Sequence, residues 1–292
     1  MANVADHYSS SAGSYHEQYQ RENLLTLKDY PANYFRLQIL VQRLASERLR
    51  SVYEVGVGEG TPLATMATMG FRVAGCDIAE AMVERAKDNF QMRGLSPDLI
   101  QWGDVQDSTT LVSQLAEGQF DSVIAAGVLP HVVNDGLVLD NIGMLVRPGG
   151  RVFIEFRNKL FSLFTFNRYT AEFILDDLLA HASPKIKDIV ASDLKNRLAM
   201  DEPPFRAITE NGSVGYDAIL SKFHNPFELL ELFKLHGFTE HRIHWYHYHP
   251  VPPMLEGEIG DIYRNEAIKL EHENSWRGYF LCSAGVIEAI KS

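Results

Sequence analysis

The stretch Ser51–Asp77 constrains the fold of this 292-residue chain more than any other. It opens with a short apolar run that ends at Glu54, and it closes with a second apolar run that ends at Asp77. Between the two runs lie a helix-like segment and three alternating glycines, Gly56, Gly58 and Gly60. Glycine permits a tight turn and lets the backbone approach a ligand without a Cβ in the way. The order strand, glycine turn, helix, strand and acid predicts the first half of a nucleotide-binding βαβ unit.

The position of the acid and the spacing of the glycines indicate which nucleotide is bound. Asp77, at the end of the second strand, is placed to accept hydrogen bonds from the two hydroxyls of a ribose. A dinucleotide fingerprint, G-x-G-x-x-G, would have its third glycine one residue later. With Glu54 two residues before the first glycine, the pattern resembles the first motif of the class I S-adenosylmethionine-dependent methyltransferases. In that family the turn approaches the amino-acid end of the cofactor, so the resemblance implies that Glu54 anchors the cofactor's ammonium, directly or through water.

Strands and helices alternate regularly through the first half of the chain. We expect strands at 50–55, 72–76, 99–102, 120–126 and 151–156, followed later by two more at 238–246 and 278–289. Helices of ordinary length separate the first five, which predicts a parallel sheet with helices on both faces. Ligands of such sheets bind beyond the C-terminal ends of the strands. The residues expected at those ends are Gly56, Asp77, Asp104 and Gly127. The predicted fold is therefore α/β, a doubly wound, mostly parallel, seven-stranded Rossmann-like methyltransferase sheet.

The resemblance extends to later motifs, and it implies further cofactor contacts there. In the family, the acid of the segment Gly103-Asp104-Val105 binds the adenine amino group, and the next backbone N–H meets an adenine ring nitrogen. Asp104 has a second interpretation as the N-cap of the following helix. The segment before the first helix often closes over the cofactor as a lid, although such a polar segment also suits a disordered tail. The cofactor-binding residues implied by the resemblance are Tyr15, Tyr19, Glu54, Gly56, Gly58, Gly60, Asp77, Ile78, Met82, Asp104, Val105, Ala126 and Gly127.

The regular pattern stops twice, and we interpret both interruptions as insertions on the ligand edge. The expected organisation is an N-terminal lid and helix at 1–49, a cofactor-binding core at 50–157, a helical substrate-binding insertion at 158–224, and the remaining core at 225–292 with a second insertion at about 247–277. Arg168 is a candidate to bind an anionic group of the acceptor, with Tyr169 beside it. The aromatic residues of the first insertion suit an acceptor pocket or the insertion's own core.

Methyl transfer to a hydroxyl or ammonium requires a base, and histidine suits that task near neutral pH. His131 lies just past the fourth expected strand, where the family often has a catalytic or substrate-facing residue. We predict it as the catalytic base, with helix capping as the alternative. A second group of histidines lies in the sixth strand and the loop after it, at 241–249, and from it we select His244 and His247 as candidate substrate contacts. An H-x-H pattern without a nearby cysteine or acid is weak support for a metal, so no metal site is expected.

Charge restricts the partners. The chain has 27 basic and 38 acidic residues, a net charge of −11, and it gains nothing from counterion release on DNA or RNA. No run of about 18 apolar residues appears. We therefore expect a small-molecule acceptor, neither nucleic acid nor membrane as a partner, and a cytoplasmic protein with a homodimer as an open possibility. Cys76 and Cys282 lie in strand-like runs and are expected as buried thiols.

These features together predict a methyltransferase that uses S-adenosylmethionine, releases S-adenosylhomocysteine and methylates an O or N atom of a small molecule. A sugar or natural-product-like acceptor is a guess from the aromatic, histidine-rich insertions. The alternatives are a quinone-type O-methyltransferase, an RNA or protein methyltransferase, and a nucleotide-binding regulator without catalysis. Quinone-precursor relatives carry acids around the histidine, and some use them with a metal. This chain has Gly127 and Pro130 there, which argues against a metal-dependent mechanism.

Overall fold

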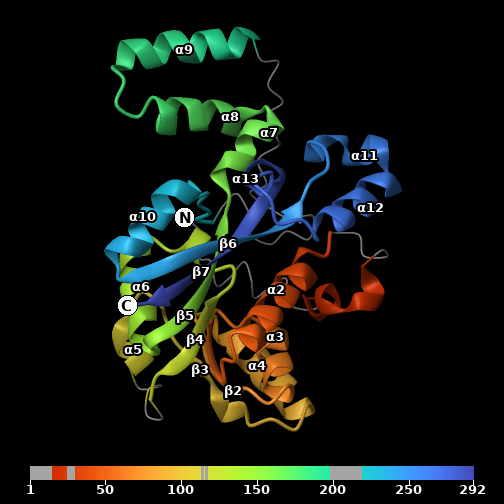
Figure 1. Cartoon of the computed structure of the whole chain (residues 1–292), viewed down its shortest axis with the longest axis vertical. Helices are drawn as coiled ribbons and strands as arrows, with labels where there is room; N and C mark the ends of the chain where they lie inside the picture. The colour runs from red at the N-terminus through yellow and green to blue at the C-terminus, as the bar shows by residue number, and fades with distance from the viewer. Residues whose placement is uncertain (1–14, 25–29, 113–114, 116–117, 198–218) are drawn as a thin grey trace.

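The computed structural model describes residues 15–24, 30–112, 115, 118–197 and 219–292. A seven-stranded sheet with the order β3-β2-β1-β4-β5-β7-β6 forms its centre (Figure 1). Strands β1 to β5 pair in parallel, and β7 lies antiparallel between β5 and β6. The strands are β1 Ser51–Val55, β2 Arg72–Asp77, β3 Ile100–Trp102, β4 Phe120–Ala125, β5 Val146–Arg157, β6 Phe238–Tyr248 and β7 Cys282–Lys291. The predicted doubly wound, mostly parallel sheet is confirmed.

Helices cover both faces of the sheet (Figure 1). One face packs against α2 Ala32–Ser46, α3 Thr61–Thr68 and α4 Glu80–Met92. The other face packs against α5 Ser108–Val112, α6 Asp135–Leu145 and α10 Pro226–Leu235. Because both faces are covered, β1 is buried at all five positions, and its run of mostly apolar residues shows no alternation with polar ones.

The start of α10 shows how local sequence sets these elements. The side chain of Asn225 accepts a hydrogen bond from the Phe227 N–H at 3.1 Å, and Pro226 occupies the first turn. Gly237, with φ of 77°, follows the helix and turns the chain into β6. These capping signals can be identified from the sequence alone.

The two insertions differ in detail from the expectation. The first contains η6 Lys159–Phe161, α7 Ser162–Thr165, α8 Arg168–Glu172, the π-helical turn η7 Phe173–Leu178 and α9 Pro184–Arg197. It projects from the sheet in Figure 1. The sequence of 170–180 predicts one amphipathic helix, whereas the structure has the end of α8 and the π-helical turn η7 there. Turns expected at Pro203-Pro204 and Asn211-Gly212 lie outside the described residues.

The second insertion contains η9 Pro253–Leu255, α11 Glu256–Ile259, α12 Asp261–Leu270 and α13 Gly278–Leu281. Residues 278–281 were expected to begin the last strand, and this is wrong. The Phe280 N–H donates to the Arg277 carbonyl at 2.9 Å in a helical turn, and β7 begins only at Cys282. The N-terminal segment forms the short helices η1 Tyr15–Tyr19 and η2 Arg21–Asn23. Among the described helices, none is both long and apolar enough to span a bilayer.

A buried carboxylate on β7 ties three neighbouring elements together. Glu288 accepts hydrogen bonds from Arg43 Nε and Arg151 Nη1, both at 2.8 Å, and from Arg43 Nη2 at 3.0 Å, and it lies 2.7 Å from His244 Nε2. These partners come from α2, β5 and β6. Burial alone would raise the pKa of Glu288, but hydrogen bonds from His244 and Arg43 outweigh burial and lower the pKa to about 2. The cluster clamps the first helix onto the antiparallel end of the sheet.

Replacing Glu288 by Gln should lower the free energy of unfolding by about 3 kcal/mol, because two guanidinium groups lose their buried counter-charge. Urea unfolding measures this change. Glu84→Gln, which breaks an exposed pair with Lys87, is the control and should cost less than about 0.5 kcal/mol. Because the pKa of Glu288 is lowered on folding, its contribution is full above pH 4.5 and falls as the pH drops toward 2. Equal costs for the two variants would contradict the clamp.

Candidate functional site

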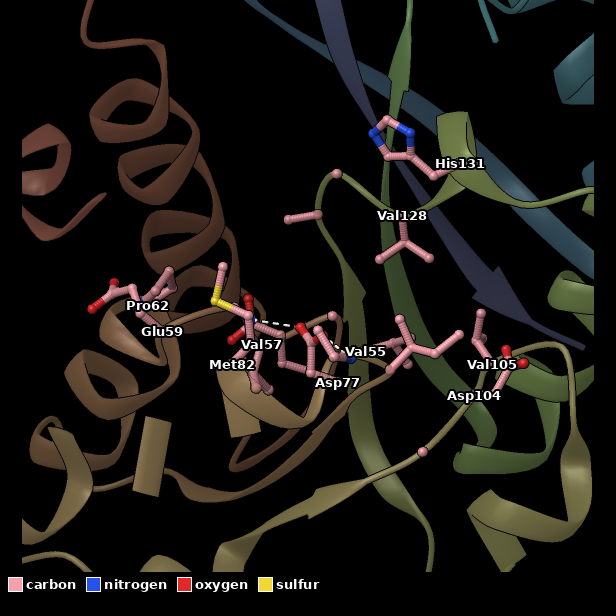
Figure 2. Close-up of a pocket in the computed structure, with 18 of the residues that line it drawn as sticks. Val55, Val57, Glu59, Pro62, Asp77, Met82, Asp104, Val105, Val128 and His131 are labelled. Atoms are coloured by element: carbon pink, nitrogen blue, oxygen red, sulfur yellow. Dashed lines mark hydrogen bonds between the residues drawn. The ribbon is translucent and has the colours of Figure 1, made fainter. Parts of the chain in front are cut away.

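A cavity of about 330 Å³ lies at the C-terminal ends of β1, β2, β3 and β4. Figure 2 shows side chains from these strand ends and the adjoining loops converging on it. The residues nominated from sequence that line it are Tyr19, Glu54, Gly56, Gly58, Asp77, Ile78, Met82, Asp104, Val105, Ala126, Gly127 and His131. Gly60 does not line it, and the side chain of Tyr15 lies outside the described part of the chain. The C-terminal ends of the parallel strands therefore bring together residues that lie far apart in the sequence.

The glycine turn after β1 forms the floor of the cavity. Gly56 has φ of 73°, and a Cβ there would lie 2.6 Å from Val128 Cγ2, so a side chain would strike the loop after β4. The Gly56 N–H donates to the Cys76 carbonyl at 2.8 Å, which joins the turn to β2. Gly60, with φ of 83°, lies against Ala86 of α4 instead. The absence of a side chain at Gly60 lets the start of α3 pack closely against α4.

The carboxylate of Asp77 is fixed by the backbone around it. One oxygen accepts from the Gly58 N–H and the other from the Ala79 N–H, both at 2.9 Å (Figure 2). Burial raises the pKa of Asp77, and these backbone hydrogen bonds oppose the rise. Each oxygen keeps a second lone pair, so the carboxylate can still accept hydrogen bonds from a ligand. The geometry suits the predicted ribose contact.

Glu54 on β1 is buried and incompletely satisfied. Its Oε2 has no hydrogen-bond partner in the part of the chain that the structure describes. Burial raises the pKa of Glu54 to about 8, although the Arg36 guanidinium opposes the rise. A buried carboxylate oxygen without a donor is costly. An ammonium in the cavity would supply both the donor and the counter-charge, so this side chain fits the amino-acid end of S-adenosylmethionine.

Arg36 lines the cavity but was not nominated from the sequence. It projects from α2, is only 9% exposed, forms an ion pair with Glu155 of β5 and donates to the Tyr19 hydroxyl at 3.4 Å. A signal was present, because Arg36 lies between Phe35 and Leu37, two buried positions of the same helix. A charged residue within a buried segment is almost always paired, and that rule could have identified it.

Asp104 follows β3 and also lines the cavity. Its Oδ1 accepts from the Gln106 N–H at 2.8 Å, and its own N–H donates to Thr110 Oγ1 at 3.0 Å. At the start of α5, the Thr109 N–H donates at 3.0 Å to Asp107, not to Asp104. The alternative interpretation of Asp104 as the cap of this helix is therefore not what the structure has. The adenine contact remains a prediction.

His131 belongs to the short helix η5 Leu129–His131 at the opposite wall of the cavity (Figure 2). Its Nδ1 lies 2.7 Å from the Leu220 carbonyl oxygen, which can only accept, so Nδ1 carries the proton. The segment that carries Leu220 is fixed in turn, since the Lys222 N–H donates to the Pro130 carbonyl at 2.8 Å. Arg157 also donates to Ser221 Oγ at 2.6 Å. This segment is the end of the insertion expected at 158–224, but its contact with His131 was not predicted, because no local pattern marks it.

The four residues nominated as substrate contacts do not line this cavity. Arg168 donates to the Tyr169 hydroxyl at 2.7 Å, so these neighbours on α8 satisfy one another. His244 faces Glu288 in the clamp described above. The ring of His247 stacks on Tyr30 with centroids 5.1 Å apart. The insertion and the histidine-rich strand end therefore contribute none of the nominated contacts to the cavity lining.

Comparison with known proteins agrees with this geometry. Residues 53–154 match a family model described as a methyltransferase domain. The chain is 31% identical over 153 residues to the ubiquinone biosynthesis O-methyltransferase of Methylocella silvestris, covering 51% of this chain and 57% of that one. It is 29% identical over 180 residues to the enzyme of the same name from Dechloromonas aromatica, covering 58% and 74%. The matches thus span only part of these relatives' lengths.

Among solved structures, magnesium protoporphyrin IX methyltransferase from Synechocystis PCC 6803, with bound S-adenosylhomocysteine, superposes with a TM-score of 0.50. The sequence identity is 14%, and the superposition covers 99% of each chain. At this identity the similarity is one of fold alone.

Asp77→Ala should weaken binding of S-adenosylhomocysteine at least tenfold, because the two ribose hydroxyls lose their acceptor. Isothermal calorimetry measures the affinity, and a thermal melt confirms that the variant is folded. Asp98→Ala, in the exposed turn before β3, is the control and should bind normally. An unchanged affinity in the Asp77 variant would refute the ribose contact.

Binding of S-adenosylhomocysteine should strengthen as the pH rises from 6 to 8. The pKa of Glu54 is about 8 in the free protein, so binding an ammonium requires Glu54 to release a proton. The gain should approach tenfold per pH unit at the lower end and level off near pH 8. Calorimetry in buffers of different ionisation enthalpy counts the released protons. Glu54→Gln should flatten the dependence, and a flat profile in the unaltered protein would contradict the assignment.

Proposed function

We propose that this chain is a class I S-adenosylmethionine-dependent methyltransferase that methylates a hydroxyl oxygen of a small molecule. The match of residues 53–154 to a methyltransferase domain and the similarity to O-methyltransferases support the proposal. The observation that carries this proposal is the placement of His131 at the cavity wall with its tautomer set by the Leu220 carbonyl. A neutral imidazole whose Nδ1 bears the proton has its lone pair on Nε2. That nitrogen is the proton acceptor that O-methylation requires.

The side chains that line the cavity suit the separate parts of S-adenosylmethionine. Glu54 would hold the cofactor's ammonium, Asp77 its ribose hydroxyls and Asp104 its adenine. Arg36, already paired with Glu155, would place positive charge beside the cofactor's carboxylate. S-adenosylmethionine supplies a methyl group on a sulfonium, which is an already activated leaving group. The task left to the protein is therefore alignment, exclusion of water and removal of one proton.

His131 performs the proton transfer in this proposal. As the acceptor oxygen bonds to the methyl carbon, the carbon–sulfur bond breaks and its electron pair stays on sulfur. The hydroxyl proton moves to His131 Nε2, and the resulting imidazolium stays oriented by the Leu220 carbonyl. Proton transfer of this kind contributes about 10²–10⁴ in rate. The imidazolium then releases this proton to solvent before the next turnover.

More narrowly, we propose that the methyl acceptor is a phenol of the quinone-precursor type. It is supported by the names of the two bacterial relatives, which match over only part of their length. The loop from Gly127 to His131 contains no acid, so the proposal uses His131 alone as the base. No feature of the described residues favours an N-acceptor, a macromolecular acceptor or a purely regulatory role over it.

His131→Asn should lower kcat at least 100-fold and leave the affinity for S-adenosylhomocysteine within twofold. The asparagine amide can still donate to the Leu220 carbonyl, but it offers no basic nitrogen. The measurement is release of S-adenosylhomocysteine with a panel of catechols and other phenols. The control is His236→Asn, at the C-terminal end of α10. Full activity in the His131 variant would remove it as the base. Tight cofactor binding without turnover on any acceptor would favour the regulator.

A further inference from the structure

A short segment, residues 219–224, carries the carbonyl that orients His131, and we call this segment the strap. Its Leu220 carbonyl accepts from His131 Nδ1 at 2.7 Å. The strap begins at the buried Ile219 and ends just before Asn225, the N-cap of α10. A carbonyl belongs to the backbone, so its place depends on how the whole strap is held. The orientation of His131 therefore depends on the contacts that anchor the strap.

Backbone hydrogen bonds anchor the strap at two places. The Lys222 N–H donates to the Pro130 carbonyl of η5 at 2.8 Å. Two residues later, the His224 N–H donates to the Arg157 carbonyl at 2.7 Å, and the His224 carbonyl accepts from the Lys159 N–H at 2.9 Å. The strap therefore bridges the helix that carries the base and the C-terminal end of β5.

An ion pair adds a third anchor, at the start of α6. Lys222 Nζ donates to Asp135 Oδ1, and His224 Nε2 lies 3.3 Å from Asp135 Oδ2. The side chains of Lys222 and Asp135 are 25% and 21% exposed, so water has little access to the pair. Burial alone would raise the pKa of Asp135, but its contacts with His224 and Lys222 outweigh burial and lower the pKa. The charged carboxylate of Asp135 therefore contacts two residues of the strap at once.

The ion pair lies next to the contact with the base. Asp135 follows His131 closely in the chain, and Lys222 follows Leu220. The hydrogen bond at His131 and the ion pair at Asp135 thus join the same two segments at neighbouring points. A shift of the strap by about 1 Å would lengthen the hydrogen bond to His131 beyond its useful range. The imidazole would then lose the constraint that keeps Nε2 free of a proton.

The pair between Lys222 and Asp135 differs from the ion pairs on outer helix faces. In the pair between Lys234 and Glu231 of α10, the side chains are 54% and 68% exposed. Water screens such a pair, so it constrains the backbone little. A shielded pair holds both partners in one geometry, because leaving either charge without the other is costly. Lys222 is therefore suited to fix the position of the strap.

We propose that Lys222, paired with Asp135, is a positioning residue for the catalytic base His131. The pair fixes the strap, and the Leu220 carbonyl then keeps the proton of the imidazole on Nδ1. The inference rests on the proposed function, because the tautomer matters only if His131 removes the proton of the methyl acceptor. Lys222 and Asp135 take no part in proton transfer themselves. Their effect on the reaction passes through His131.

The experiment compares Lys222→Met, which removes the charge, with Lys222→Arg, which keeps it. Lys222→Met should lower kcat about tenfold, because the base is misplaced, and Lys222→Arg should restore most of the rate. The affinity for S-adenosylhomocysteine should stay within about twofold in both variants, since neither residue of the pair lines the cavity. In ¹⁵N-histidine NMR of the full chain at pH 8, His131 should carry its proton on Nδ1, and Lys222→Met should show both tautomers. His131→Asn assigns the resonance, and Lys234→Met, which breaks the exposed pair of α10, is the matched control and should change neither readout.

The decisive measurement adds Lys222→Met to the His131→Asn variant. If Lys222 acts through the base, the residual rate should then fall less than about twofold further. A further tenfold loss there, or an unchanged rate or tautomer in Lys222→Met alone, would overturn the inference. If a thermal melt shows that Lys222→Met is unfolded, Ser221→Ala is measured in its place, because it removes only the hydroxyl to which Arg157 donates, and it should change the tautomer in the same direction. Full activity of His131→Asn by itself would instead contradict the proposed function.

Discussion

The ion pair between Arg36 and Glu155 is the interaction on which the arrangement of this site depends. Both side chains are about nine-tenths buried, and they join α2 to the middle of the sheet at the wall of the cavity. Moving two charges out of water is costly, and removing either partner of such a pair leaves an unpaired buried charge. Pairing also leaves Arg36 close enough to Glu54 to influence its ionisation. The N-terminal helix is therefore part of the binding site as well as part of the core.

The same edge of the sheet holds two histidines in different surroundings. His131 has one nitrogen committed to the Leu220 carbonyl, which fixes the tautomer that a base requires. The His247 ring stacks on Tyr30, with centroids 5.1 Å apart, and its centroid lies 4.6 Å from that of His249. His131 is thus oriented by a backbone hydrogen bond, whereas His247 is oriented by ring stacking.

Much of the cofactor site was accessible from the sequence because it depends on short-range rules. The turn at Gly56, the acid at Asp77 and the segment at Asp104 each follow a strand that local patterns identify. Parallel strands bring their C-terminal ends to one edge, so a correct list of strands predicts that these residues converge. Gly60 illustrates the limit of a motif, since it belongs to the glycine pattern yet serves contact between α3 and α4.

The sequence by itself determined the alternating elements, the parallel core and the acidic strand ends, because periodicity, capping and turn chemistry act over a few residues. Only the tertiary structure decided the partners of side chains that meet across long separations. It placed Glu155 beside Arg36, Leu220 beside His131 and Tyr30 beside His247. It also turned His244 toward Glu288 and kept Arg168 on the insertion. Such contacts depend on how packed layers meet, and no local pattern in the chain encodes them.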